Sequence, residues 1–236
     1  MQPELIPIRP NQSAQQTLGA AVATDSHKVL RNTYVLLALT MVPTLVGAWI
    51  GIATAPIVIQ HLMIASLIVM GAVVGLQFAI VANRNSALGI ALLLVMTGVL
   101  GWWLGPLLNF ALALRNGAQL VGYAAGGTGL VLLVMGAIAT GTKRDFSFMG
   151  KFLFVGMIAL LIAMFANMFL HIPALALTIS TLAIVVFSLF LLHDLSRIVN
   201  GGERNYIVAT TGVYLSLINV FANLLQILIA LSGNRD

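Results

Sequence analysis

Charged residues occur in clumps along this chain, and long stretches between the clumps contain no Asp, Glu, Lys or Arg. Only 7% of the 236 residues are charged, whereas soluble domains carry about 25%. An ionised group at the centre of a bilayer costs roughly 2.5–3.5 kcal/mol on insertion scales, so a membrane-embedded chain needs stretches of this kind. The uncharged stretches are residues 32–83, 85–114, 116–142, 152–193 and 205–234.

The lengths of these stretches indicate how many times the chain crosses the membrane. A helix needs about 20 predominantly apolar residues to cross about 30 Å of hydrocarbon. Stretches 32–83 and 152–193 are each long enough for two such helices, and each of the others for one. The sequence therefore predicts seven helices, over residues 34–51, 57–81, 87–104, 119–140, 152–170, 174–193 and 206–231.

Seven spans with short connections leave no room for a separate globular domain. We therefore predict an all-α membrane protein with one seven-helix domain over residues 31–236, behind a flexible tail over residues 1–30. Because proline lacks a backbone donor, we place the links inside the two long stretches at residues 55–56 and 171–173. Pro106 is expected to end or kink the third helix.

The basic residues predict the orientation of the bundle, because Lys and Arg are enriched in cytoplasmic loops. Nine of the 11 basic residues fall on the same side of the membrane as the N-terminus. Only two, Arg115 and Arg235, fall on the other side. We therefore expect a cytoplasmic N-terminus and, with an odd number of spans, a C-terminus on the opposite, periplasmic side.

Glycines four residues apart recur in the predicted helices. Lipid tails are as apolar as leucine, so membrane helices associate partly through small residues that let their backbones approach closely. We expect four pairs to be helix-contact faces, namely Gly47/Gly51, Gly71/Gly75, Gly101/Gly105 and Gly122/Gly126.

The seventh predicted helix carries a polar stripe. Ser216, Asn219, Asn223 and Gln226 recur at spacings of three, four and three, so all four share one face. Amides facing lipid would be costly, so this face should point into the bundle or toward water. Two interpretations remain open: hydrogen bonds between helices, or the lining of a hydrated cavity.

Asp194 is the acidic residue nearest the membrane interior, at the end of the sixth predicted helix. It is either an interfacial carboxylate paired with Arg197 or Arg84, or a titrating gate whose charge changes with pH. The chain has no cysteine, and no His pair has metal-ligand spacing with an acid. With no G-x-S-x-G or H-E-x-x-H motif either, we expect no metal, no cofactor and no catalysis.

Several segments together resemble one membrane-protein family. Residues 193–207 read HDLSRIVNGGERNYI and lead into YLSLINVF at 214–221. This combination resembles the signature of the Bax inhibitor-1 family. Its bacterial YccA-like branch is matched more closely by HKVLRNTY at 27–34, GPLLN at 105–109 and RDFSF at 144–148.

The resemblance implies a seven-helix protein of the bacterial inner membrane and two possible activities. Members of the YccA-like branch bind FtsH, a membrane-anchored ATP-dependent protease, with its HflK and HflC partners, and restrain degradation of membrane proteins. Other family members form a pH-sensitive calcium leak, gated by two aspartates and an arginine latch.

The leak residues carry over only in part. Asp194 matches the aspartate of span six and Arg84 falls where the latch arginine would be, but Ser216 occupies the position of the second aspartate. A serine cannot share a proton with Asp194, and one acid is a poor site for Ca²⁺, which prefers six to eight oxygen ligands. The sequence therefore favours a modulator of FtsH, with a calcium or cation leak as the alternative. The tail over residues 1–30 would give the protease motor a segment to grip.

Reporter fusions test the predicted topology. A cytoplasmic reporter should be active at the N-terminus and inactive after residue 236, because the nine basic residues hold their loops inside. Both termini in one compartment would contradict the arrangement and would move residues 200–205 out of the cytosol.

Overall fold

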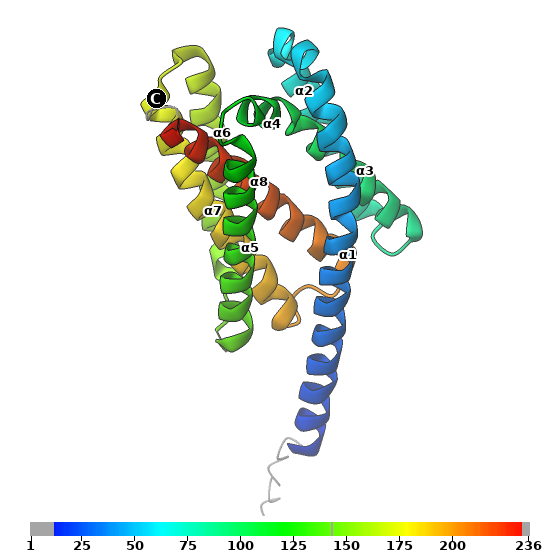
Figure 1. Cartoon of the computed structure of the whole chain (residues 1–236). Helices are drawn as coiled ribbons and strands as arrows, with labels where there is room; N and C mark the ends of the chain where they lie inside the picture. Colours follow the sequence, from blue (N-terminus) through cyan, green and yellow to red (C-terminus); the bar gives the residue numbers. More distant parts are fainter. Residues whose placement is uncertain (1–11, 143, 233–236) are drawn as a thin grey trace, which may run out of the picture.

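A computed structural model of the chain describes residues 12–142 and 144–232, with side chains from Asp25 onward. The described residues form eight α-helices and one short 3-10 helix, η1 (Figure 1). In chain order they are α1 Gln12–Gln60, α2 Leu62–Ala82, α3 Ala87–Trp103, α4 Gly105–Leu112, α5 Gly117–Gly141, η1 Ser147–Met149, α6 Gly150–Leu170, α7 Pro173–Val199 and α8 Tyr206–Ser232.

Seven segments of the described chain are long and apolar enough to cross a membrane, which confirms the predicted number of spans and the all-α class. The third of these segments, Ala87–Leu112, combines α3 and α4. Pro106 lies in the first turn of α4, directly after α3 ends at Trp103, as expected for a residue that cannot donate to the preceding turn.

Helix α8 lies at the centre of the bundle. It crosses obliquely between a group formed by α1, α2 and α3 and a group formed by α5, α6 and α7 (Figure 1). It contacts α1, α2, α3, α4, α5 and α7. The main apolar core surrounds its first half, where Val213 and Tyr214 are almost completely buried.

The predicted link at residues 55–56 is wrong, because α1 continues through Pro56 and ends at Gln60. Proline at position 56 removes the backbone donor that would serve the Ile52 carbonyl. The side-chain amide of Asn109, in α4, donates to that carbonyl at 3.5 Å. A neighbouring helix thus supplies the missing donor, which is how membrane helices tolerate internal proline. The turn between α1 and α2 is at His61 instead.

The predicted link at residues 171–173 is confirmed. His171 adopts a left-handed conformation with φ of 52° and ends α6, and Pro173 begins α7. Proline is favoured in the first turn of a helix because its missing donor is not needed there.

The predicted tail, residues 1–30, lies partly outside the described residues, which begin at Gln12. From Gln12 the chain is helical without a break into the first span, and this end of α1 projects beyond the other helices (Figure 1). The boundary predicted at residue 30 therefore does not coincide with the start of a helix. The flexibility of the tail stays a prediction.

Two of the four glycine pairs form helix contacts, both between α1 and the α3–α4 segment. A Cβ at Gly51 or Gly105 would overlap the other helix's backbone, as would one at Gly47 or Gly101. The other two pairs were predicted wrongly. Gly71 and Gly75 on α2, like Gly122 and Gly126 on α5, have no atom within 4 Å of an added Cβ in the described chain.

Alanine substitutions separate these two classes of glycine. Gly105→Ala should destabilise the bundle by about 1–3 kcal/mol, the usual cost of overpacking, because its methyl group would collide with the Gly51 backbone. Gly75→Ala is the matched control and should be neutral, since nothing lies near its new methyl group. Thermal unfolding in detergent measures both, and equal stability of the two variants would contradict the contact.

Candidate functional site

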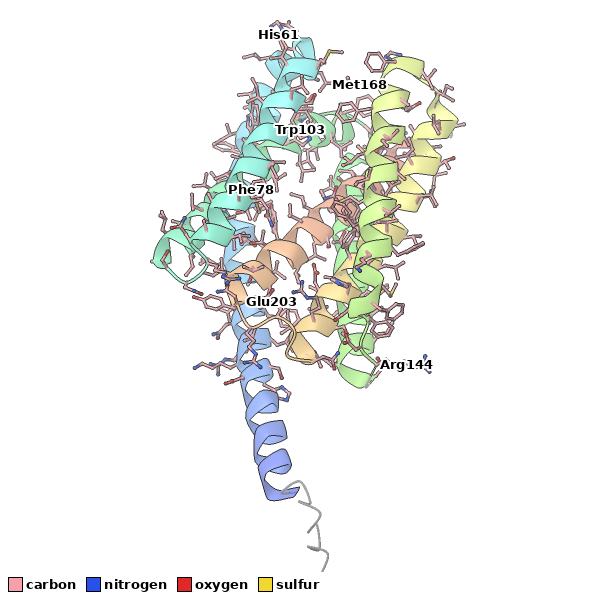
Figure 2. All side chains as sticks on the ribbon, turned by 180° about the vertical axis from the view of Figure 1, so that it is seen from behind. His61, Phe78, Trp103, Arg144, Met168 and Glu203 are labelled. Atoms are coloured by element: carbon pink, nitrogen blue, oxygen red, sulfur yellow. The ribbon has the colours of Figure 1, made fainter. Side chains whose placement is uncertain are left out.

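The predicted site residues lie at or near one end of the bundle, here called the Asp194 end. It consists of the end of α7 and the three connections between α2 and α3, α5 and α6, and α7 and α8. Figure 2 shows Glu203 and Arg144, from two of these connections, toward the opposite end of the bundle from His61, Trp103 and Met168. The sequence predicts Asp194 at the end of a helix over residues 174–193. Helix α7 instead continues to Val199, so Asp194 lies inside it.

Asp194 lies in the contact between α7 and α8. Its carboxylate is 19% exposed, and its Oδ1 is 3.0 Å from Nδ1 of His193. A Cβ at Gly212 of α8 would lie 2.5 Å from Oδ2 of Asp194, closer than real side chains approach. The carboxylate therefore packs directly on the α8 backbone at Gly212, and a larger residue at that position would displace the carboxylate.

His193 extends this contact to the connection between α5 and α6. Its ring is 11% exposed, and its Nε2 would lie 2.8 Å from a Cβ at Gly150, the first residue of α6. Just before this helix, the hydroxyl and the backbone N–H of Ser147 donate to the exposed Asp145 carboxylate, and these bonds hold the pKa of Asp145 below its usual value. His193 thus links Asp194 to this connection.

Ser196, one turn of helix after His193, fastens the same connection to α7. Its buried hydroxyl accepts the backbone N–H of Phe146 at 3.1 Å and the side-chain amide of Asn200 at 3.1 Å. Phe146 also packs against the main core. These contacts hold the RDFSF segment against the end of α7.

Arg197 pairs with Glu203 at 3.4 Å, and not with Asp194 as its spacing suggested. The chain turns back sharply after α7, with Gly201 at a φ of 74°, and the N–H groups of Gly202 and Glu203 both donate to the Arg197 carbonyl. This turn brings the Glu203 carboxylate back beside the guanidinium of Arg197. The end of α7 is thereby capped within residues 200–203, which read NGGE.

Asn205 joins the connection after α7 to the one after α2. Its Oδ1 accepts the N–H groups of Ile207 and Val208, which caps the start of α8. Its Nδ2 donates to the Arg84 carbonyl at 2.7 Å and to Oδ1 of Asn85 at 2.9 Å. Arg84 is therefore held through its backbone, and no ion pair joins it to Asp194 in the part of the chain that carries described side chains.

The polar stripe of α8 makes three kinds of contact. Ser216 is buried and lies one turn beyond Gly212, so it shares the face on which Asp194 packs. The amides of Asn219 and Asn223 donate to carbonyls of their own helix, at Leu215 and Asn219. The exposed Gln226 accepts a hydrogen bond from the buried Ser180 of α7 at 2.9 Å. Gln226 of the stripe thus forms a hydrogen bond between helices. That the stripe lines a hydrated cavity stays a prediction.

Tyr214 is a structural junction that the sequence did not reveal. Its ring is 1% exposed, and its hydroxyl lies 2.8 Å from Oγ1 of Thr44 in α1 and 3.2 Å from the Thr97 carbonyl in α3. It belongs to the YLSLINVF segment, but its partners are too distant in sequence for any local pattern to predict. Through Tyr214, α8 is bonded to both helices of the glycine contact.

Comparisons with known proteins cover most of the chain. Residues 26–234 match the family model Bax1-I, described as inhibitor of apoptosis-promoting Bax1. The chain is 40% identical to Modulator of FtsH protease YccA of Escherichia coli K12, over 86% of this chain and 90% of that protein. The protein from another Escherichia coli strain, with the same identity and coverage, is named Inner membrane protein YccA. An uncharacterized membrane protein of Vibrio cholerae is 40% identical over 89% of this chain and 92% of its own length.

Two asparagine variants test how the Asp194 end is assembled. Asn205→Ala removes the cap of α8 together with both bonds to the connection after α2, so it should lower stability by about 0.5–2 kcal/mol. Asn85→Ala removes one of those bonds and leaves the cap intact, so its effect should be smaller. Thermal unfolding in detergent compares them, and an Asn205→Ala variant as stable as the wild type would refute the cap.

Proposed function

The chain belongs to the Bax inhibitor-1 family, and on that premise we propose that it binds the FtsH protease and modulates its activity. It is a multi-pass protein of the bacterial inner membrane. In the proposed role it performs no catalysis of its own and restrains the degradation of other membrane proteins. HflK and HflC, the partners that the resemblance implies, would belong to the same complex.

One observation carries this proposal. The relative named as a modulator of FtsH is 40% identical, and the match covers 90% of that protein and 86% of this chain. The shared region therefore includes nearly the whole bundle rather than one helix pair.

The shape of the molecule supports the same role. The N-terminal part of α1 projects past the bundle, and no other helix of the described chain lies beside it (Figure 1). An isolated helix of this length is marginally stable in water, so a pulling motor could unwind it with little resistance. Residues 2–25 would reach roughly 80 Å when extended at about 3.3 Å per residue. Behind this segment lies a bundle held together by glycine contacts and hydrogen bonds, which would slow its extraction.

The calcium-leak alternative has less support. Ser216 occupies the position of the second aspartate, and the neighbour of Asp194 is His193. A serine and a histidine do not supply the set of oxygen ligands that Ca²⁺ prefers. We therefore do not extend the proposal to ion conduction.

Deleting residues 2–25 tests the role of the projecting segment. The deletion should lengthen the half-life of the protein in cells with active FtsH, because the motor loses the segment that it grips, and should change nothing in cells without FtsH. Pulse-chase labelling measures both half-lives.

The matched control replaces residues 2–25 with a scrambled sequence of the same composition and length, which should restore turnover because the segment acts through its length and exposure and not through a particular motif. Turnover that is equally fast with and without the segment would count against the proposed mode of engagement.

A further inference from the structure

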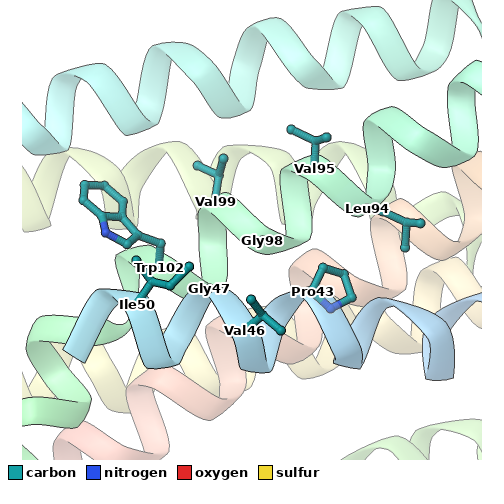
Figure 3. Close-up of a pocket in the computed structure, with 9 residues that line it drawn as sticks. All are labelled: Pro43, Val46, Gly47, Ile50, Leu94, Val95, Gly98, Val99 and Trp102. Carbon is teal, nitrogen blue, oxygen red and sulfur yellow. The ribbon is translucent and has the colours of Figure 1, made fainter. Parts of the chain in front are cut away.

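We propose that the groove between α1 and α3 binds one acyl chain of a membrane phospholipid. The groove has a volume of about 550 Å³ and lies where Gly47 of α1 approaches Gly98 of α3 (Figure 3). Its volume falls within the range of about 300–1,000 Å³ that is typical of sites for small organic ligands. Nothing in the proposed modulation of FtsH requires this site, so the two proposals stand or fall separately.

The groove is a consequence of the glycine contact. A Cβ at Gly47 would overlap the Gly98 carbonyl, so the two backbones touch there and form the floor. Larger side chains on either side of this floor form the walls of the groove, among them Val46 and Ile50 from α1 and Val95 from α3. Close backbone approach between two helices with branched side chains therefore leaves a channel along their junction.

The chemistry of the lining excludes a polar occupant. The side chains that face the groove are aliphatic, apart from Trp102. The indole N–H of Trp102 already donates to Oγ1 of Thr54 at 2.9 Å. Water or a charged ligand would find no hydrogen-bonding side chain free there, and would lose its own hydration.

The position of the groove indicates which molecule occupies it. Its residues lie within the uncharged stretches 32–83 and 85–114, so the groove is at membrane depth. Val46 and Val95 are 54% and 55% exposed in the isolated chain, so the groove opens outward rather than into the bundle. At that depth the surrounding medium is hydrocarbon, and an acyl chain is the thin, flexible, apolar molecule that can enter.

A second protein helix fits this groove less well. A helix with its side chains is about 10–12 Å across, and membrane helices pack closely only where small residues let the backbones meet. Gly47 is already covered by α3, while Val46, Ile50 and Val95 project at the rim. A helix laid along the groove would rest on these branched side chains and leave the floor empty.

Quenching of tryptophan fluorescence by brominated lipid tests the site. In one variant Trp49 and Trp103 are replaced by Phe, which leaves Trp102 as the reporter inside the groove. In the reference variant Trp102 and Trp103 are replaced, which leaves Trp49, a 78% exposed residue in contact with bulk lipid. Both are placed in vesicles of dioleoylphosphatidylcholine containing increasing fractions of its dibrominated analogue.

Gly98→Val places a branched side chain in the groove. A Cβ at Gly98 would meet only Pro43, at 3.6 and 3.8 Å, which is ordinary van der Waals contact. Trp102 should be quenched in the parent variant and should lose most of that quenching with Gly98→Val, while Trp49 is quenched equally with and without the substitution. Gly98→Ala should give a smaller loss, and unchanged Trp49 quenching verifies insertion.

Two results would overturn the proposal. One is Trp102 quenching that is absent in the parent variant or unaffected by Gly98→Val. The other is efficient disulfide formation between copies carrying Val95→Cys, since the natural chain has no cysteine and such a crosslink would place a second protein over the groove.

Discussion

The bilayer removes the hydrophobic effect as a reason for these helices to associate, and the rest of the structure depends on what replaces it. A leucine side chain is as well solvated by lipid tails as by a neighbouring helix. The helices must therefore be held together by close packing and by hydrogen bonds. In this chain α1 and the α3–α4 segment meet backbone to backbone through Gly47, Gly51, Gly101 and Gly105. Tyr214 of the central helix then bonds to both sides of that contact.

The Asp194 end is assembled by a different set of contacts. Polar side chains there bond to backbone groups of neighbouring connections: Ser196 to the segment before α6, and Asn205 to the connection after α2. Asp194 itself packs between His193 and the α8 backbone at Gly212. The result is an end whose three connections are fastened to α7 and α8, beside an N-terminal helix that projects freely. A firm bundle with a protruding segment is what the proposed engagement with a protease motor requires.

Much of the fold could be predicted because the membrane penalises charge so strongly. The uncharged stretches alone gave seven spans, and Pro173 marked a real turn. The link predicted at Pro56 was wrong because the rule that proline ends a helix assumes that no other group replaces its missing donor. Asn109, from another helix, donates to the Ile52 carbonyl instead. The glycine spacing identified faces that permit close contact, but spacing cannot say whether a helix of the same chain covers them. Gly71 and Gly75 illustrate this limit, because no atom of the described chain lies within 4 Å of an added Cβ at either position.

The site was less predictable because its contacts are not local. Spacing along a helix suggested Arg197 as the partner of Asp194, but the turn at Gly201 carries Glu203 back to Arg197. Asp194 meets His193 instead, next to it in sequence, and Gly212, which only the packing of α7 on α8 brings near. Arg84 was identified by resemblance, and its observed bond is made by its backbone carbonyl, which no residue type could have indicated.

The central functional claim is that this bundle acts through FtsH. Purification of the full chain from native membranes in mild detergent, with quantification of bound proteins, tests it most directly. FtsH should be recovered in near-stoichiometric amounts, and an unrelated membrane protein purified in the same way should recover none. Absence of FtsH from the purified complex, in membranes where the protease is present, would contradict the claim.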